Sequence, residues 1–242
     1  KLIKDELGTE VELVQSDVAP LYQGVSRGDL DAMMMAWLPQ THADYYDKVK
    51  DKVETLGTVY DGAKLGWVVP AYIPESEIAS IEDLKKPEVQ KKLSGIVQGI
   101  DPGAGLTRLS EKAVKDYGLD DYKLQISSEA GMLTTVDRAM RSEKWFVATS
   151  WSPHWMFGKY KLRYLTDPKE SLGQAEHVDI LASKKFREEN PKAAEFLSRM
   201  KVPLNDLEAA MFTAQETSYE AAIEKYIKDH PDQVKAWVGE QS

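Results

Sequence analysis

Apolar residues occur along this chain in short runs that alternate with longer segments in which apolar positions recur at helical spacing. Short buried strands are predicted at residues 33–35, 65–70, 96–100, 124–127, 145–147, 162–165 and 178–182. Amphipathic helices are predicted at residues 106–117, 129–140, 191–200, 204–218 and 219–237. From residue 96 to 147 strands and helices alternate, a pattern typical of a mostly parallel sheet with helices on both faces.

The first part of the chain predicts smaller elements. Residues 1–8 have the pattern of an amphipathic helix that stops at Gly8, so further chain is expected upstream. The other elements expected there are a strand at residues 11–15, a helix from a cap at Ser16 or Asp17 to Gly28, a helix at residues 45–53 that ends no later than Gly57, and a helix start at the box formed by Ser80 and Asp83.

Two strand exits carry the aromatic residues that point to a function. One reads Trp-Phe-Val-Ala-Thr-Ser-Trp-Ser-Pro-His-Trp over residues 145–155 and holds three of the six Trp residues. The other, Met-Met-Met-Ala-Trp-Leu-Pro-Gln-Thr-His over residues 33–42, repeats the order of apolar run, Trp, Pro and His. Because sites in α/β proteins lie where the chain leaves the sheet, we interpret these exits as two walls of one ligand site on two facing lobes.

Composition limits the class of protein. A chain of 242 residues predicts one large or two modest domains rather than one small core, and we favour two. The net charge of -9, spread over helical faces, disfavours nucleic acid as a partner. No apolar run approaches the ~20 residues that a membrane span requires. Cysteine is absent, which excludes disulfides, thiolate catalysis and cysteine zinc sites within this sequence.

The indole rings indicate what the ligand would carry. The negative face of an aromatic ring attracts a cation by roughly 0.5–2 kcal/mol per contact, and a quaternary ammonium, which cannot donate hydrogen bonds, suits such a site best. Trp37 and Trp151 are the candidates for this cage. A lone Trp in such a sequence is more often a core residue, and it is the pairing of two similar exits that favours a binding role.

An anion site is predicted as well. The segment Gly-Ala-Gly-Leu at residues 103–106 lies between a strand and a helix, where free N–H groups can bind a carboxylate or a phosphate. This signal is weak alone, since such turns often serve only backbone conformation, and the missing later Gly and Gly-Lys-Ser/Thr disfavour phosphate cofactors. His42 could donate to a bound carboxylate, or could instead be a surface or helix-capping imidazole.

Catalysis and metal binding find less support. No Gly-x-Ser-x-Gly is present, the acids are expected on solvated helix faces, and His154 is expected at most to pin its turn. No His pair has the spacing of a helical metal site, and no second cluster completes the pair of His42 and Asp44. The Met run at residues 33–35 fits a core strand better than a metal or haem site. We therefore expect no catalytic residue, no metal and no cofactor.

Four stretches carry a resemblance to a known family. They are Met-Met-Ala-Trp-Leu-Pro-Gln-Thr-His at residues 34–42, Gly-Trp-Val-Val-Pro at 66–70, Gly-Ile-Asp-Pro-Gly-Ala-Gly at 99–105 and Trp-Ser-Pro-His-Trp at 151–155. They resemble the substrate-binding proteins of glycine betaine and proline betaine ABC importers. The resemblance implies the type II periplasmic-binding-protein fold, an α/β fold of two Rossmann-like lobes joined by a two-segment hinge with the ligand cleft between them. We expect a first lobe of residues 1–95 plus 184–242, without its N-terminal strand, and a second lobe of residues 96–183.

The same resemblance implies a trimethylammonium group held by three Trp rings and a carboxylate held by backbone amides and one His. Matched by motif, two cage positions fall on Trp37 and Trp151, the amides on Gly105 and Leu106, and the His on His42. The third Trp belongs, in this family, to a strand before the helix at residues 1–8. The substitutes by residue type, none of which matches the motif, are Trp67, Tyr22 and Trp155.

The implied function is that of an extracytoplasmic receptor, periplasmic, lipid-anchored or permease-fused. It would close on glycine betaine or a related quaternary ammonium solute and deliver it to an ABC permease without catalysis. Membrane contact is expected only through the permease or an anchor outside this sequence. The alternatives are a binder of choline, carnitine or dimethylsulfoniopropionate with the same fold and, less favoured, an enzyme on this scaffold with His42 and Asp101 as acid and base.

Overall fold

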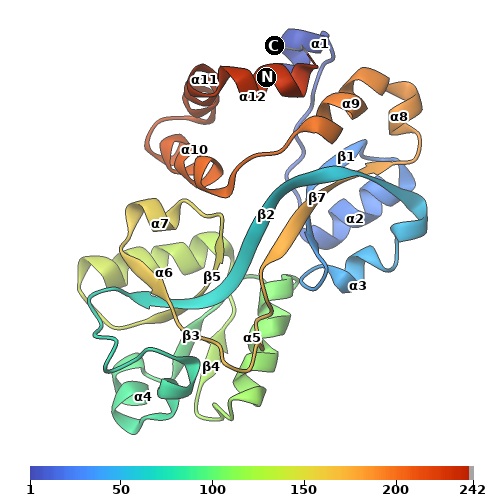
Figure 1. Cartoon of the computed structure of the whole chain (residues 1–242). Coiled ribbons are helices and arrows are strands. Elements are labelled where there is room, and N and C mark those ends of the chain that lie inside the picture. The colour runs from blue at the N-terminus through green and yellow to red at the C-terminus, as the bar shows by residue number, and fades with distance from the viewer. Residues whose placement is uncertain (240–242) are drawn as a thin grey trace. The chain divides into compact units, whose positions relative to one another are not determined.

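The 18-residue strand β2 (Val53–Pro70) belongs to two sheets in succession. Its first half pairs with β7 and its second half pairs with β5 and β6 (Figure 1). The other strands are β1 (Ala32–Leu38), β3 (Ile96–Gln98), β4 (Lys123–Gln125), β5 (Val147–Ser152), β6 (Leu162–Tyr164) and β7 (Glu176–Ser183). The computed structural model describes residues 1–239 in this way.

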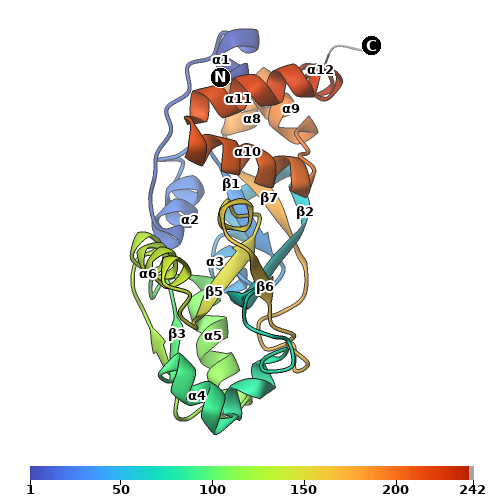
Figure 2. The same ribbon diagram turned by 90° about the vertical axis from the view of Figure 1, so that its left-hand side faces the viewer.

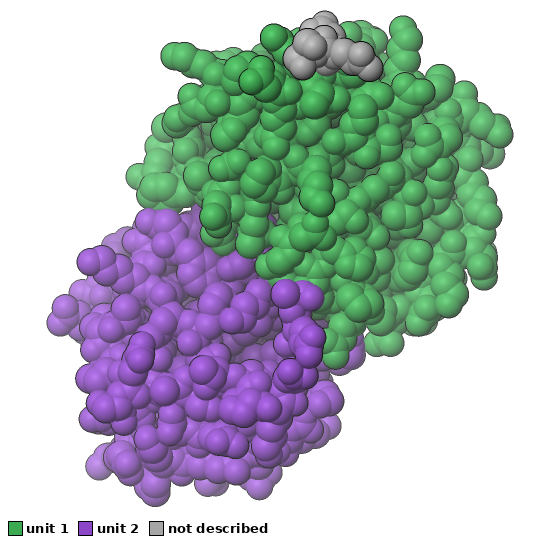
Figure 3. All heavy atoms as spheres, viewed as in Figure 1, with its two compact units in different colours: residues 1–63, 176–242 green, residues 64–175 purple. Residues whose placement is uncertain are grey.

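The chain divides into two compact units at this strand (Figure 3). Unit 1 consists of residues 1–63 and the segment that begins at Glu176, and unit 2 consists of residues 64–175. These boundaries differ from the lobes expected at residues 1–95 plus 184–242 and 96–183. Residues 64–95 belong with unit 2 because the second half of β2 is paired within that unit, and β7 belongs with unit 1 because it pairs with β1 and the first half of β2.

Unit 1 is built on an antiparallel sheet in the order β1, β7, β2. Its helices are α1 (Leu2–Leu7), α2 (Val18–Arg27), α3 (Ala43–Tyr46), the 3-10 turn η1 (Lys50–Lys52), α8 (Phe186–Glu189), α9 (Pro191–Arg199), α10 (Leu204–Glu216), α11 (Tyr219–Asp229) and α12 (Pro231–Val238). Helix α9 contacts both α1 and α12, so the first and last helices of the described chain lie in one group (Figure 2).

Unit 2 combines antiparallel and parallel pairing. Strand β3 is parallel to both β4 and β5, whereas β2 is antiparallel to β5 and β6. Its helical elements are η2 (Ile81–Lys85), α4 (Pro87–Leu93), α5 (Gly105–Asp116), α6 (Glu129–Arg141) and α7 (Met156–Lys159). The parallel pairing expected from residues 96–147 is confirmed for β3, β4 and β5, whose crossovers contain α5 and α6. The antiparallel pairing of this unit comes from β2, which lies outside that alternating segment.

The local stop and start signals of the sequence are confirmed. Helix α1 ends at Gly8 and α2 ends at Gly28, and both glycines adopt the left-handed conformation with φ of 67° and 78°. Ser80 and Asp83 form the predicted capping box, although the element that follows is the 3-10 helix η2.

Two predicted elements of the first part are wrong. Residues 11–15 form no strand, and their side chains are largely exposed, with Leu13 at 92%. The helix expected at residues 45–53 is reduced to the single turns α3 and η1, and Gly57 lies inside β2 at a shift of the strand register. Pairing with β7, more than 100 residues away in sequence, therefore overrides the weak local preference there.

Each unit has its own apolar core. The core of unit 1 lies between α2 and the sheet, and its buried members are Leu21, Tyr22, Val25, Met33, Ala36, Leu38, Val49, Val53 and Leu181. Only part of the Met run belongs to it, since Met34 is 37% exposed. In unit 2 the indole of Trp67 is completely buried. No helix within residues 1–239 has both the length and the apolar character needed to cross a bilayer.

Candidate functional site

The first aromatic exit lies at the end of β1 in unit 1. Trp37 pairs with Val178 of β7 and is 9% exposed. A cis peptide bond between Leu38 and Pro39 follows, and the chain then turns into α3 at His42, which is 4% exposed. The prediction that Trp37 and His42 share one site is consistent with this geometry, since both lie on one turn.

The hydrogen bonds of His42 determine which ring nitrogen carries the proton. The backbone N–H of Trp37 donates to Nδ1 of His42 at 3.2 Å, and the hydroxyl of Tyr22 lies 3.3 Å from the same atom. Since a backbone N–H can only donate, Nδ1 is the acceptor and the proton of the neutral ring is on Nε2. His42 therefore carries an Nε2–H group that can donate to an anion.

A buried carboxylate holds the turn that carries His42. Glu176, the first residue of β7, is 6% exposed. Its Oε1 accepts from the backbone N–H groups of Gln40 at 2.6 Å and Thr41 at 2.9 Å, and its Oε2 accepts from the hydroxyl of Thr41. This role was not predicted, because the acidic residues were expected on solvated helix faces.

The second aromatic exit lies at the end of β5 in unit 2, and it also contains a cis peptide bond, between Ser152 and Pro153. Trp151 is half-buried, and the ring of His154 meets it edge to face with the centroids 4.7 Å apart. Nδ1 of His154 accepts from the backbone N–H of Met156 at 3.1 Å, so the proton is on Nε2, which lies 3.2 Å from the carboxylate of Glu129. His154 thus pins its turn, as predicted, and also supports the Trp151 ring.

The predicted anion site lies at the start of α5 in unit 2. Gly105 and Leu106 are the first two residues of this helix, and Ala104 at the cap position has no side chain that could bond to them. Within residues 1–239 their N–H groups have no hydrogen-bond acceptor. These N–H groups and the helix dipole favour a bound anion, and α5 contacts β5, the strand that carries Trp151.

The three substitute aromatics have different surroundings. Trp67 is fully buried and its indole N–H donates to Ser110 Oγ at 2.9 Å, so it is a core residue and offers no ring face to a ligand. Tyr22 is also buried and stacks on Tyr45 with centroids 5.7 Å apart, and burial raises the pKa of its hydroxyl. Trp155 is half-buried with its ring 5.3 Å from that of His154.

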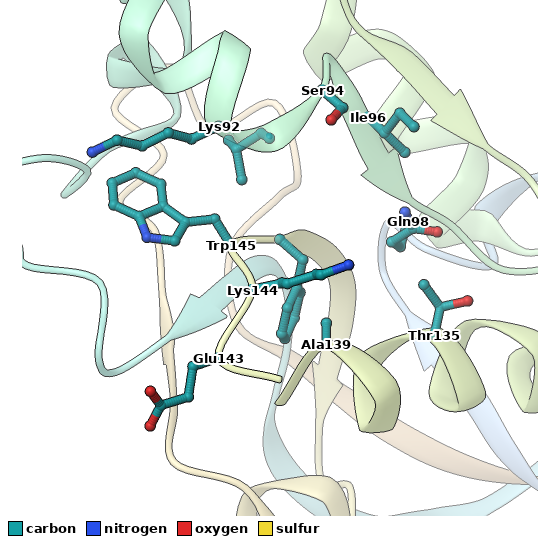
Figure 4. A pocket seen from close by; sticks show the side chains of 11 residues that line it. Lys92, Ser94, Ile96, Gln98, Thr135, Ala139, Glu143, Lys144 and Trp145 are labelled. Atoms are coloured by element: carbon teal, nitrogen blue, oxygen red, sulfur yellow. The ribbon is translucent and has the colours of Figure 1, made fainter. Parts of the chain in front are cut away.

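A pocket of about 510 Å3 lies elsewhere in unit 2, beside the first residues of β3 and β5 (Figure 4). None of the predicted site residues lines it. The ammonium of Lys92 lies 3.9 Å from the centre of the Trp145 ring, and Lys144 lines the same pocket. Because the aromatic face is already covered by a cation and a second ammonium is close, this pocket is unsuited to a quaternary ammonium.

Metal ligation has no structural basis in the described part of the chain, where no three His, Asp or Glu side chains come together to hold an ion. The residues that the sequence singled out instead form three groups, each at the end of an element. Trp37 and His42 lie together in unit 1, Trp151 lies with His154 in unit 2, and the free amides lie at the start of α5. The supporting roles of Glu176 and Glu129 were not predicted from the sequence. The only available signal was position, since Glu176 is the first residue of β7 and Glu129 is the first residue of α6.

Two mixed α/β units linked by the chain at β2 and β7, with aromatic and amide groups at strand and helix ends, define the class of type II periplasmic binding proteins. Residues 1–229 match the family model of the substrate binding domain of ABC-type glycine betaine transport systems, and the chain belongs to this family.

Several relatives agree with this assignment. The glycine betaine/carnitine transport binding protein GbuC of Listeria monocytogenes is 36% identical over 155 residues, which are 63% of this chain and 52% of that protein, so the match spans about half of its length. Lactococcal OpuAC, solved in a closed form with glycine betaine, is 38% identical, with a TM-score of 0.88 over 98% of this chain and 91% of its own. A choline binding protein solved with choline is 26% identical, with a TM-score of 0.84 over 98% of this chain and 84% of its own.

Proposed function

We propose that this chain binds glycine betaine, or a close analogue with both a quaternary ammonium and a carboxylate, and hands it unchanged to the permease of an ABC importer. The observation that carries the proposal is the pair of backbone N–H groups on Gly105 and Leu106 at the start of α5, which have no hydrogen-bond acceptor within residues 1–239. His42, whose Nδ1 is an acceptor so that Nε2 carries the proton, would supply a third donor to the ligand. A carboxylate can accept from all three through two charged oxygens, whereas choline offers only the neutral oxygen of its hydroxyl.

The cationic end of the ligand would be held by aromatic faces. A trimethylammonium group cannot be hydrogen-bonded, so it loses little when water is replaced by the rings of Trp37 and Trp151. Exclusion of water from the bound ammonium would strengthen each of these contacts.

A third aromatic would complete the cage from a strand upstream of α1, as the resemblance implies. Two features of unit 1 support a strand there. Strand β1 pairs only with β7 among residues 1–239, which leaves its other edge open, and the neighbouring segment at residues 11–14 exposes Val11, Leu13 and Val14. An added strand would use the open edge and cover apolar side chains.

The site and partner imply an extracytoplasmic location, where an importer collects its solute. The relatives described as periplasmic support this, among them the glycine betaine/proline betaine-binding protein of Salmonella typhimurium. No chemical step is part of the proposal, and the His42 and Asp101 pair is assigned no acid or base role.

Calorimetry on the full chain with glycine betaine, proline betaine, carnitine, choline and dimethylsulfoniopropionate tests the proposal. We expect glycine betaine to bind more tightly than choline and to raise the melting temperature most. Tighter binding of choline would overturn the carboxylate site, and conversion of any ligand to a product would overturn the transport role.

A further inference from the structure

We propose that Glu176 is a positioning residue for ligand selectivity: its buried carboxylate fixes the turn of residues 39–42 so that Nε2–H of His42 can reach the ligand carboxylate. This inference rests on the proposed function. It concerns a residue that touches no ligand, at the point where the chain re-enters unit 1 after unit 2.

Glu176 anchors this turn to β7 through a buried carboxylate. One carboxylate receives the amides of Gln40 and Thr41 and the Thr41 hydroxyl, three donors within two consecutive residues. His42 is the next residue in the chain. A displaced Thr41 would therefore move the His42 backbone directly, while Trp37 would stay in register because it is paired within β1 and β7.

Glu176 is also fixed from the other side. It pairs with Ala63 of β2, and these two residues are the last of β2 and the first of β7 that belong to unit 1. The carboxylate thus links the His42 turn to both strands that connect the units. A neutral amide in its place can accept from both N–H groups through its oxygen, but its NH2 group then faces the Thr41 hydroxyl as a donor. That hydroxyl loses its charged acceptor, and all three bonds lose their charge assistance.

The same strand offers a matched control. Asp179, three residues further along β7, is also a buried carboxylate at 8% exposed, and it accepts from the hydroxyl of Thr58 at 2.7 Å. This bond ties Asp179 to β2, and His177 of its own strand lies 3.6 Å away. Asp179→Asn removes a buried charge from β7 while the three bonds of Glu176 to the turn are kept, so it reports what a purely structural loss does.

The experiment compares Glu176→Gln and Asp179→Asn by calorimetry with glycine betaine and with choline. We expect Glu176→Gln to weaken glycine betaine binding by roughly tenfold, the effect of misaligning one hydrogen bond to a charged group, and choline binding by less than about threefold. Asp179→Asn should change both affinities equally or not at all. Thr41→Val, which removes one of the three donors, should give a smaller change of the same kind.

A second readout is the tautomer of His42, measured from the 15N shifts of its ring. Glu176→Gln should mix the Nδ1–H and Nε2–H forms, whereas Asp179→Asn should leave Nε2–H in place. If glycine betaine fails to bind the unchanged protein, the proposed function is wrong. If it binds, and Glu176→Gln leaves both the ligand preference and the tautomer unchanged, only the role of Glu176 is wrong. Should Glu176→Gln not fold, Thr41→Val decides the matter by the same two measurements.

Discussion

The backbone N–H of Trp37 donates to the imidazole Nδ1 of His42, five residues later, at 3.2 Å. This bond joins the residue proposed to hold the ammonium to the residue proposed to hold the carboxylate. It also keeps the His42 proton on Nε2, so that the ring meets an anion as a donor. One turn thus prepares both halves of a zwitterion site.

The first prediction concerns this donor. His42→Ala should weaken glycine betaine binding by roughly tenfold and choline binding much less, because only glycine betaine loses a hydrogen bond to its charge. Calorimetry with both ligands measures the ratio. Tyr22→Phe is the control, since it removes a hydroxyl near Nδ1 but keeps the bond from Trp37. An equal loss for both ligands would remove the carboxylate role of His42.

The second prediction concerns the indole rings. Trp37→Ala and Trp151→Ala should each weaken glycine betaine and choline alike by at least ~10-fold, since each cation–π contact contributes roughly 0.5–2 kcal/mol and its loss also admits water. Trp145→Ala is the control, because the Trp145 ring already faces Lys92 in a different part of unit 2. If Trp151→Ala binds both ligands with unchanged affinity, the hypothesis that Trp151 holds the ammonium group is wrong.

The third prediction concerns the support of Trp151. His154→Ala removes the ring that meets Trp151 edge to face and the acceptor of the Met156 N–H. We expect a smaller loss of affinity than for Trp151→Ala, equal for glycine betaine and choline, because only the cage is loosened. A selective loss for glycine betaine in the calorimetric titrations would instead make His154 a ligand of the carboxylate.

The fourth prediction separates core from site. Trp67→Phe removes the indole N–H that donates to Ser110 Oγ and leaves unfilled space in a fully buried position. The free energy of unfolding should fall by about 1–3 kcal/mol. Urea titration measures the loss, and calorimetry should find glycine betaine affinity nearly unchanged. A large loss of affinity in a folded Trp67→Phe protein would show that Trp67 takes part in ligand binding.

The fifth prediction concerns the capping box at η2. Burial acts to raise the pKa of Asp83, but hydrogen bonds from the Ala79 and Ser80 N–H groups and from Lys86 together lower it. Because the pKa is lowered in the folded state, the Asp83 carboxylate stabilises the fold at pH values above its ordinary pKa of about 3.9. This stabilisation is lost as the pH falls through the lowered pKa of the folded state. Asp83→Asn should therefore destabilise the protein at pH 7 and make little difference in acid, as urea titrations at several pH values can test.

The sequence by itself determined the features that depend only on residues close together along the chain. The stops at Gly8 and Gly28 and the box of Ser80 and Asp83 follow from backbone conformation and bonds within a few residues. The pairing of Trp and His at two strand exits could be read for the same reason, since in both cases Nδ1 of the His binds a backbone N–H a few residues away. The family resemblance followed from those motifs.

Only the tertiary structure decided which distant residues meet. Strand β2 continues through Gly57 because β7, more than 100 positions further along the chain, pairs with it, and Glu176 binds Thr41 across 135 positions. Trp67 and Trp37 are both strand residues in similar apolar runs. The indole of Trp67 donates to Ser110 in a core, whereas Trp37 lies at the end of β1, just before a turn. Such contacts depend on strand order and on which side chains share a face, and no short window of sequence contains that information.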